Sequence, residues 1–258
     1  MINMKKIFFI LSIVLLPTTL WASNGKQAIL ETAAAGDEQY RLGNYDSAAK
    51  YYSKVLEANY ASADLYYNLG NAYYRTGQIG LAILNYERAL RLQPSMSDAR
   101  ENLELANSKT VDRITPLPRF FLVNWYNALI TRLTPHTWRI LLCLFFLLAG
   151  ASLALLLLAR SITIKKISLA TLILSAGLFL IALFFLIKST NFFNSHNEAV
   201  ILDASVTVKS SPELQSVDKL ILHEGTKVTI SESLAGWHKI TLADGTSGWC
   251  QSNLLEKI

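Results

Sequence analysis

The sequence predicts a multidomain membrane protein that combines an all-α repeat solenoid, a two-helix transmembrane hairpin and a small all-β barrel. Two blocks in the middle of the chain, residues 140–159 and 167–187, contain no charged side chain. Each block would form a helix about 30 Å long, which matches the hydrocarbon thickness of a bilayer. A 34-residue repeat precedes them at residues 29–96, and short alternating strands follow at residues 197–258.

The connector between the apolar blocks, residues 160–166, sets the predicted orientation. It carries Arg160, Lys165 and Lys166, and short basic loops stay in the cytoplasm. Both soluble parts are then extracytoplasmic, although basic residues beyond the outer ends of the blocks weaken this bias. The alternative is a pair of buried helices in a soluble core, which are usually shorter and carry a polar stripe. The blocks hold no ionisable side chain other than Cys143, which disfavours an ion or substrate path.

The first 22 residues have the layout of a secretory signal peptide. Lys5 and Lys6 precede a ten-residue apolar run at residues 7–16, and small residues begin at Ala22. An uncleaved anchor is the alternative, because Leu20 occupies a position where a small residue is preferred before the cut. In either case the chain from residue 23 onward is expected to be exported.

The repeat becomes visible when residues 29–62 are placed above residues 63–96, an offset of 34. The matching pairs are Gly36 with Gly70, Tyr40 with Tyr74, Arg41 with Arg75, Gly43 with Gly77, Ala48 with Ala82, Tyr52 with Tyr86, and Leu56 with Leu90. This pattern resembles the tetratricopeptide family, whose unit is helix, turn and helix. Gly77 is expected to end the first helix of its repeat in left-handed geometry, and Pro94 to stop the second. Residues 97–109 predict a third, capping helix.

The resemblance to tetratricopeptide proteins also implies where a partner would bind. The ligand face of that family is the inner surface of the first helix of each repeat. The candidate groove residues in this sequence are Asp37, Tyr40, Arg41, Tyr67, Asn71, Tyr74 and Arg75. Asn71 and Arg75 lie one helical turn apart and could hold a peptide carboxylate, whereas Asp37 breaks this pattern in the first repeat.

Residues 111–139 connect the repeats to the hairpin. Pro116 and Pro118 break helical structure, and an aromatic stretch follows them. This stretch predicts a helix lying on the bilayer surface, with Trp125 and Trp138 at the level of the headgroups. A helix–helix contact with another membrane protein is the alternative.

The last part of the chain, residues 188–258, comprises a linker and a β-rich domain. Candidate strands lie at residues 199–203, 207–209, 228–231, 237–242 and 247–251. The segments VTVKSSP, LHEGTKVTI and GWHKITLADGTSGWCQSNLLEKI resemble a bacterial SH3-type domain, a small barrel whose relatives bind cell walls or proteins. Trp237 and Trp249 are therefore the candidate surface for stacking on a glycan or peptide. Support of the barrel core is the alternative for both.

Several classes of function have no support in the sequence. The net charge is +5, but the basic residues are scattered, so nucleic acid is not an expected partner. The two cysteines show no spacing typical of a metal site or an intramolecular disulfide. No nucleophile–base pair or Gly-rich phosphate loop is present, so no enzymatic activity, metal or cofactor is expected.

The order of these parts resembles the BatE-type family of bacterial aerotolerance proteins. This resemblance implies a non-enzymatic inner-membrane scaffold with both soluble domains in the periplasm. Its implied partners are other membrane subunits of a Bat-type complex, including proteins with metal-binding domains of the von Willebrand type, and a MoxR-type ATPase. The alternative function is a membrane tether that binds peptidoglycan through the SH3-type domain.

The predicted divisions are residues 1–22 (signal peptide), 23–110 (tetratricopeptide repeats at 29–62 and 63–96 plus the capping helix), 111–139 (linker and interfacial helix), 140–159 (first span), 160–166 (cytoplasmic loop), 167–187 (second span) and 188–258 (linker and SH3-type domain).

Overall fold

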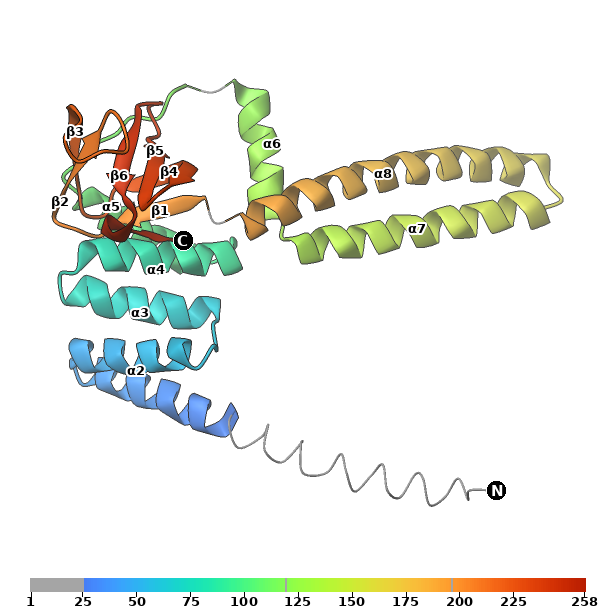
Figure 1. Cartoon of the computed structure of the whole chain (residues 1–258). Helices are drawn as coiled ribbons and strands as arrows, with labels where there is room; N and C mark the ends of the chain where they lie inside the picture. The colour runs from blue at the N-terminus through green and yellow to red at the C-terminus, as the bar shows by residue number, and fades with distance from the viewer. Residues whose placement is uncertain (1–25, 119, 196) are drawn as a thin grey trace, which may run out of the picture.

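The computed structural model describes residues 26–118, 120–195 and 197–258. The predicted signal peptide at residues 1–22 lies outside the described residues. Figure 1 shows three parts: stacked helices, a long helical hairpin and a β-sheet that lies against the last of the stacked helices.

The stacked helices follow the period that the sequence predicts. They cover residues 26–41, α2 Tyr45–Glu57, α3 Ala63–Arg75, α4 Ile79–Leu92 and α5 Ser97–Ser108. The starts of α2 and α4 are 34 residues apart. Gly43 and Gly77 both have φ +80°, which confirms left-handed geometry after the first helix of each repeat. In the first repeat Asn59, with φ 58°, takes up left-handed geometry after α2. Helix α4 ends two residues before Pro94, as expected.

Each repeat is held together by one glycine packed against one tyrosine ring. A Cβ added at Gly36 would lie 2.6 Å from a ring carbon of Tyr52, and one at Gly70 would lie 2.7 Å from the equivalent carbon of Tyr86. Both tyrosines are buried. Only glycine therefore allows the two helices of a repeat to approach this closely.

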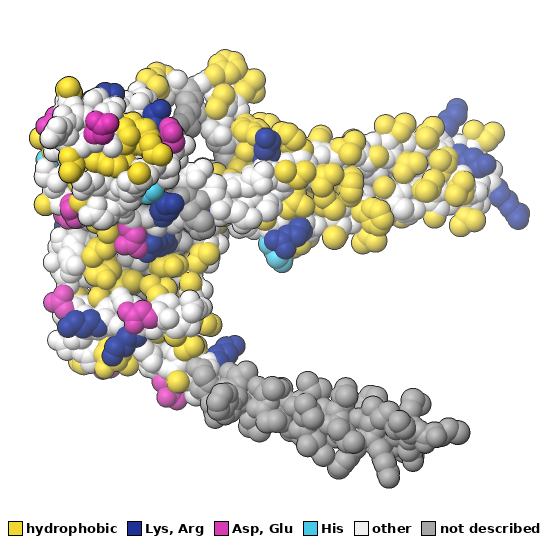
Figure 2. Space-filling model, viewed as in Figure 1, with side chains coloured by type: hydrophobic (Ala, Val, Ile, Leu, Met, Phe, Trp, Pro, Cys, Tyr) yellow, Lys and Arg dark blue, Asp and Glu magenta, His cyan; other side chains and the backbone are white. Residues whose placement is uncertain are grey.

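The hairpin consists of α7 Pro135–Leu158 and α8 Ile162–Asn194. Both helices are long and apolar enough to cross a membrane, by length and composition. Helix α7 begins five residues before the predicted first span and ends one residue before its end, and α8 begins five residues before the predicted second span. The helices are therefore joined by three residues, 159–161, rather than by the whole of 160–166. Figure 2 shows apolar side chains along the visible face of the hairpin and basic side chains around its turn. The contact between the helices includes a hydrogen bond of 3.0 Å from the Thr171 hydroxyl to the Ser152 hydroxyl.

Helix α6 Phe121–Arg132 runs across the base of the hairpin (Figure 1). Trp125 is exposed, but Trp138 is buried within α7 and stacks on Phe185 of α8 at 4.9 Å between ring centroids. The Trp138 ring therefore forms part of the contact between α7 and α8, and its position at the level of the headgroups stays a prediction. The Ser189 hydroxyl of α8 also donates to backbone oxygens near the end of α6, which fixes α6 to the hairpin.

The C-terminal part is a seven-stranded antiparallel sheet with the order β3-β2-β6-β5-β4-β1-β7. The strands are β1 Glu198–Ile201, β2 Ser205–Lys209, β3 Asp218–His223, β4 Lys227–Leu234, β5 Trp237–Thr241, β6 Ser247–Gln251 and β7 Leu255–Lys257. The five predicted strands are present, whereas β3 and β7 were missed.

The predicted barrel is wrong, because the sheet is not closed. Its edge strands β3 and β7 do not pair with one another. The β7 edge instead faces α4, where Arg88 donates to the carboxylate of Glu256 and to the carbonyl oxygen of Lys257, both at 2.7 Å. Covering by a helix thus protects an edge that a barrel would protect by closure.

The sheet and α4 share one hydrophobic core. Ile83 and Leu84 of α4 cluster with Val200 and Ile258 of the sheet. The approach is close, because a Cβ added at Gly80 would lie 3.3 Å from backbone atoms of the sheet. Apolar burial on both sides of α4 joins the repeats and the sheet into one unit.

Asp112 fastens the segment after α5 to the sheet. Its carboxylate lies 2.8 Å from the His223 Nδ1 atom and accepts from the His223 backbone at 2.7 Å and the Thr226 hydroxyl at 2.6 Å. Burial by itself would raise the pKa of Asp112. The hydrogen bonds from Thr226 and His223 outweigh that effect, so the pKa lies below its ordinary value.

Gly70→Ala is expected to destabilise the repeats by about 1–3 kcal/mol, because the added methyl group overlaps the Tyr86 ring. Thermal unfolding of the full chain in detergent, followed by far-ultraviolet circular dichroism, measures this loss. The matched control is Gly177→Ala, where nothing lies within 4 Å of the added Cβ. Equal stability of the two variants would contradict the close contact.

Asp112→Asn is expected to destabilise the chain at neutral pH and to have little effect in acid. Because the folded-state pKa of Asp112 is depressed, its carboxylate stabilises the fold above the unfolded-state value of about 4. That contribution is lost as the pH falls through the lower, folded-state pKa. Denaturation at pH 7 and pH 3 should show the difference from wild type shrinking in acid. Asp203→Asn, at an exposed position, is the control.

Candidate partner-binding groove

Two adjoining hollows form a groove on the inner face of the stacked helices. The larger has a volume of about 430 Å³, and the smaller about 210 Å³. They share Tyr40 and Asn71 in their walls. The larger is lined by Tyr40, Tyr67, Asn71, Tyr74, Arg75, Tyr86, Asn102 and Leu105, and the smaller by Asp37, Tyr40, Arg41, Tyr52, Asn68 and Asn71. The structure thus brings all seven residues predicted for the groove together; their role in binding stays a prediction.

Two tyrosines at equivalent positions of the repeats, Tyr52 and Tyr86, form the floor of the groove, and each donates a hydrogen bond to a groove residue. The Tyr52 hydroxyl donates to the Asp37 carboxylate at 2.7 Å, and the Tyr86 hydroxyl donates to the Asn71 side-chain oxygen at 2.8 Å. Burial raises the pKa of both tyrosines above the ordinary value. Both hydroxyls therefore stay protonated and act as fixed donors.

Asp37 has a local structural role that accounts for its departure from the expected carboxylate-binding pattern. Besides the Tyr52 hydroxyl, its carboxylate accepts from the side-chain amide of Asn68 at 3.4 Å. Asn71, at the equivalent position, uses its side-chain oxygen to accept from Tyr86 and from Asn102, the latter at 2.8 Å. Because the side-chain oxygen of Asn71 is already occupied, its side-chain NH2 group is the part that can donate a hydrogen bond to a ligand.

Two cations at the groove, Arg75 in its wall and Lys109 at the end of α5, lie over tyrosine rings. The guanidinium of Arg75 is 5.7 Å from the Tyr45 ring centroid, and the Lys109 ammonium is 4.2 Å from the Tyr74 ring centroid. A hydrogen bond with Tyr40 raises the pKa of Arg75 above its ordinary value. Within the described part of the chain, no acidic side chain forms an ion pair with Arg75 or Lys109. Both can therefore attract an anionic group.

Arg41 differs from Arg75 although the two positions are equivalent in the repeat. Its guanidinium forms an ion pair of 3.0 Å with Glu38, and both side chains are largely exposed. An exposed pair of this kind contributes at most about 1 kcal/mol. Arg41 thus lines the smaller hollow with its charge already paired.

Helix α5 contributes a wall of the groove that the sequence analysis missed. Asn102 and Leu105 line the larger hollow, and Lys109 follows the helix. Adding one more period of 34 to Arg41 and Arg75 would have reached Lys109. The helix was interpreted only as a polar cap, so this signal was not used.

The two tryptophans predicted as a second surface lie away from the groove. Trp237 of β5 and Trp249 of β6 are both partly exposed. The strand register pairs Lys239 with Trp249 and Trp237 with Gln251, so the two rings lie on the same face of the sheet. The core residues Ile240 and Cys250 lie on the opposite face, where burial raises the pKa of Cys250 to about 11.

Comparison with known protein families identifies the helical part. Residues 33–103 match the family model described as tetratricopeptide repeat. The match covers most of the first repeat, all of the second and the first seven residues of α5, and these elements contribute to the groove. Among curated proteins, none matches the chain.

Tyr86→Phe is expected to lower the free energy of unfolding by about 1 kcal/mol, because the side-chain oxygen of Asn71 loses the hydrogen bond from the Tyr86 hydroxyl. Thermal unfolding of the full chain in detergent measures the change. Tyr60→Phe is the matched control, since Tyr60 is 39% exposed. An equal loss in both variants would show that the hydrogen bond to Asn71 contributes nothing specific.

Proposed function

We propose that this chain is a non-enzymatic, membrane-anchored scaffold that binds a protein partner in the groove of its tetratricopeptide repeats. Repeats of this family act in protein–protein interaction, and residues 33–103 match it. The observation that carries the proposal is the groove itself. Its tyrosine-lined floor, exposed Leu105 and two cations without acidic partners suit an extended peptide that ends in, or contains, a carboxylate.

The hairpin is the proposed anchor. Its apolar surface and the basic residues around its turn support insertion with the connector in the cytoplasm. In this orientation both soluble parts lie in the periplasm of a bacterial cell, on the outer side of the inner membrane. The order of repeats, apolar hairpin and C-terminal β-rich part is the basis for extending the proposal to a Bat-type aerotolerance complex, with other membrane subunits as partners.

The outer face of the sheet supports a second candidate function, a tether to peptidoglycan. Trp237 and Trp249 lie on one face of adjacent strands, and the Lys239 ammonium is 6.0 Å from the Trp249 ring centroid. Partly exposed aromatic rings on a rigid sheet can stack on sugar rings or on a peptide.

Tyr67→Ala combined with Arg75→Ala is expected to reduce partner capture at least about tenfold, because tyrosine and arginine dominate the binding energy of interfaces. A photo-crosslinking amino acid at Leu105, used in native membranes with mass spectrometry, would first identify the partner. Co-purification of that partner with wild type and variant then measures capture.

The control is Lys50→Ala combined with Tyr51→Ala, a matched pair of changes on α2 that lines neither hollow. Circular dichroism should show the same helicity in all three proteins. Unchanged capture by the groove variant would contradict recognition in the groove. Retention of the full chain on purified peptidoglycan, lost in Trp237→Ala with Trp249→Ala and unaccompanied by a groove partner, would favour the tether.

A further inference from the structure

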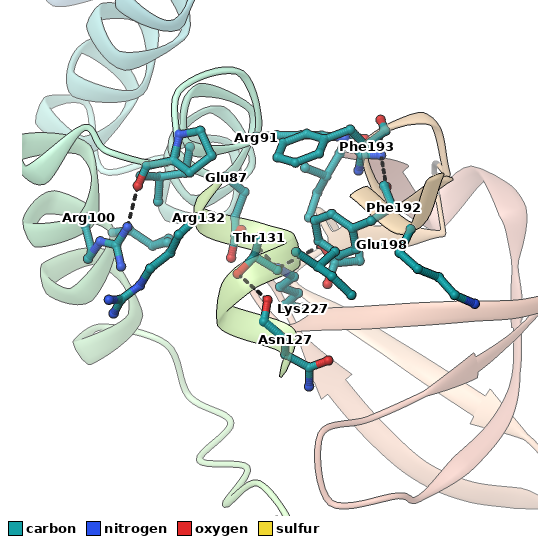
Figure 3. A pocket seen from close by; sticks show the side chains of 16 residues that line it. Glu87, Arg91, Arg100, Asn127, Thr131, Arg132, Phe192, Phe193, Glu198 and Lys227 are labelled. Atoms are coloured by element: carbon teal, nitrogen blue, oxygen red, sulfur yellow. Dashed lines mark hydrogen bonds and ion pairs between the residues drawn. The ribbon is translucent and has the colours of Figure 1, made fainter. Parts of the chain in front are cut away.

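A separate cavity of about 590 Å³, larger than either hollow of the groove, lies where the repeats, α6, the end of α8 and the sheet meet (Figure 3). It shares no lining residue with the groove. It is open at the base of the hairpin, and four parts of the chain that are distant in sequence contribute to its walls. The proposed scaffold function does not use it.

Basic side chains outnumber acidic ones around this cavity. They are Arg91, Arg100, Arg132, Lys188 and Lys227, against Glu87 and Glu198. Two of the basic groups are satisfied by the protein. Lys227 forms ion pairs with Glu87 at 2.9 Å and with Glu198 at 3.1 Å. Arg91 donates to backbone oxygens of Phe192, Phe193 and Ser195 at the end of α8, where the helix dipole favours a cation.

The other three basic groups keep their charge available. Within the described residues, no acidic side chain pairs with Arg100, Arg132 or Lys188. Arg100 donates to the Pro94 carbonyl oxygen at 2.6 Å, which orients its guanidinium. Figure 3 shows the guanidinium groups of Arg100 and Arg132 directed to the same side of the cavity.

A contact between α6 and α8 brings the backbone of Arg132 near that of Lys188. The Ser189 hydroxyl donates to the backbone oxygens of Ile130 and Leu133, at 3.3 and 3.1 Å. Arg132 lies between those two acceptors, and Lys188 directly precedes the donor. The two residues therefore lie on helices that meet at the base of the hairpin, and an anion at that junction is attracted by both charges.

Apart from Asn127 and Thr131, the remaining lining of the cavity is apolar. Leu90, Ile130, Phe192 and Phe193 contribute to its walls. The uninterrupted apolar stretch of α8 ends at Ile187, one residue before Lys188. If the hairpin spans a bilayer, the cavity therefore lies at the depth of the phosphate groups, with its apolar wall beside the acyl chains.

We propose that this cavity binds the headgroup of an anionic phospholipid, with Arg100, Arg132 and Lys188 around the phosphate and the phenylalanine rings against the glycerol and upper acyl carbons. This inference rests on the proposed insertion of the hairpin in a membrane. It does not depend on what the groove binds.

The test uses the full chain purified in detergent and titrated with phosphatidylglycerol or with phosphatidylcholine of the same acyl chains. Native mass spectrometry counts the lipid that stays bound. Wild type should retain phosphatidylglycerol with about tenfold preference, and Arg132→Gln with Lys188→Gln should remove most of this preference. Neither side chain forms an ion pair in the described structure, so the variant should fold; an unchanged melting temperature checks this. Arg132→Lys should largely preserve the preference.

Lys165→Gln with Lys166→Gln is the matched control, because it removes the same charge at the opposite end of the hairpin. An equal loss in both double variants would overturn the inference, since general charge would then explain the binding. Competition by inorganic phosphate without preference between the lipids would also overturn it, in favour of a free-anion site. Carbonate extraction of wild-type membranes tests insertion separately. Absence of lipid preference in a protein that resists extraction and captures its groove partner would contradict this inference alone.

Discussion

Packing on both sides of α4 is the constraint on which the rest of the structure depends. Tyr86 fits against Gly70 of α3, Ile83 lies in the core shared with the sheet, and Gly80 lies against the backbone of Ile201 in β1. Half of the fourteen residues of α4 are buried. A solenoid that ended at α4 would expose this second apolar side to water, so a terminal layer is required. The sheet and α5 together supply that layer, which explains why the sheet remains open on the edge that α4 covers.

The sequence predicts the helices and turns within each repeat, but it does not predict which distant segments pack against one another. The 34-residue offset identified Gly36 with Gly70, and Tyr52 with Tyr86, as equivalent positions, and the structure shows the same glycine–tyrosine contact in both repeats. The contact between Asp112 and His223 joins residues 111 positions apart, and neither residue carries a pattern that names the other. The same holds for Lys227 with Glu87. Strand β7 escaped prediction because three residues, two of them exposed, contain no alternation to detect.

Equivalent positions in a repeat need not be equivalent in chemistry. Arg41, Arg75 and Lys109 follow one another at intervals of 34 residues, but only Arg41 has an acid one turn away, at Glu38. The other two cations lie over tyrosine rings, which stabilise a cation without neutralising it. The positive character of the groove is therefore concentrated between α3 and α5. The seven groove residues could be predicted from the repeat, whereas this asymmetry depends on side-chain neighbours in the folded chain.

One helix connects the groove to the hairpin. Tyr86 and Arg91 are five residues apart on α4. Tyr86 lines the groove, and Arg91 donates to a backbone oxygen at the end of α8. Only residues 195–197 separate the end of α8 from the start of β1, and β1 contributes Val200 to the core on α4. A flexible linker would let the repeats rotate freely above a membrane, but these contacts fix them to the base of the hairpin. In the proposed membrane-anchored scaffold, a partner in the groove would then be presented at a defined height and orientation.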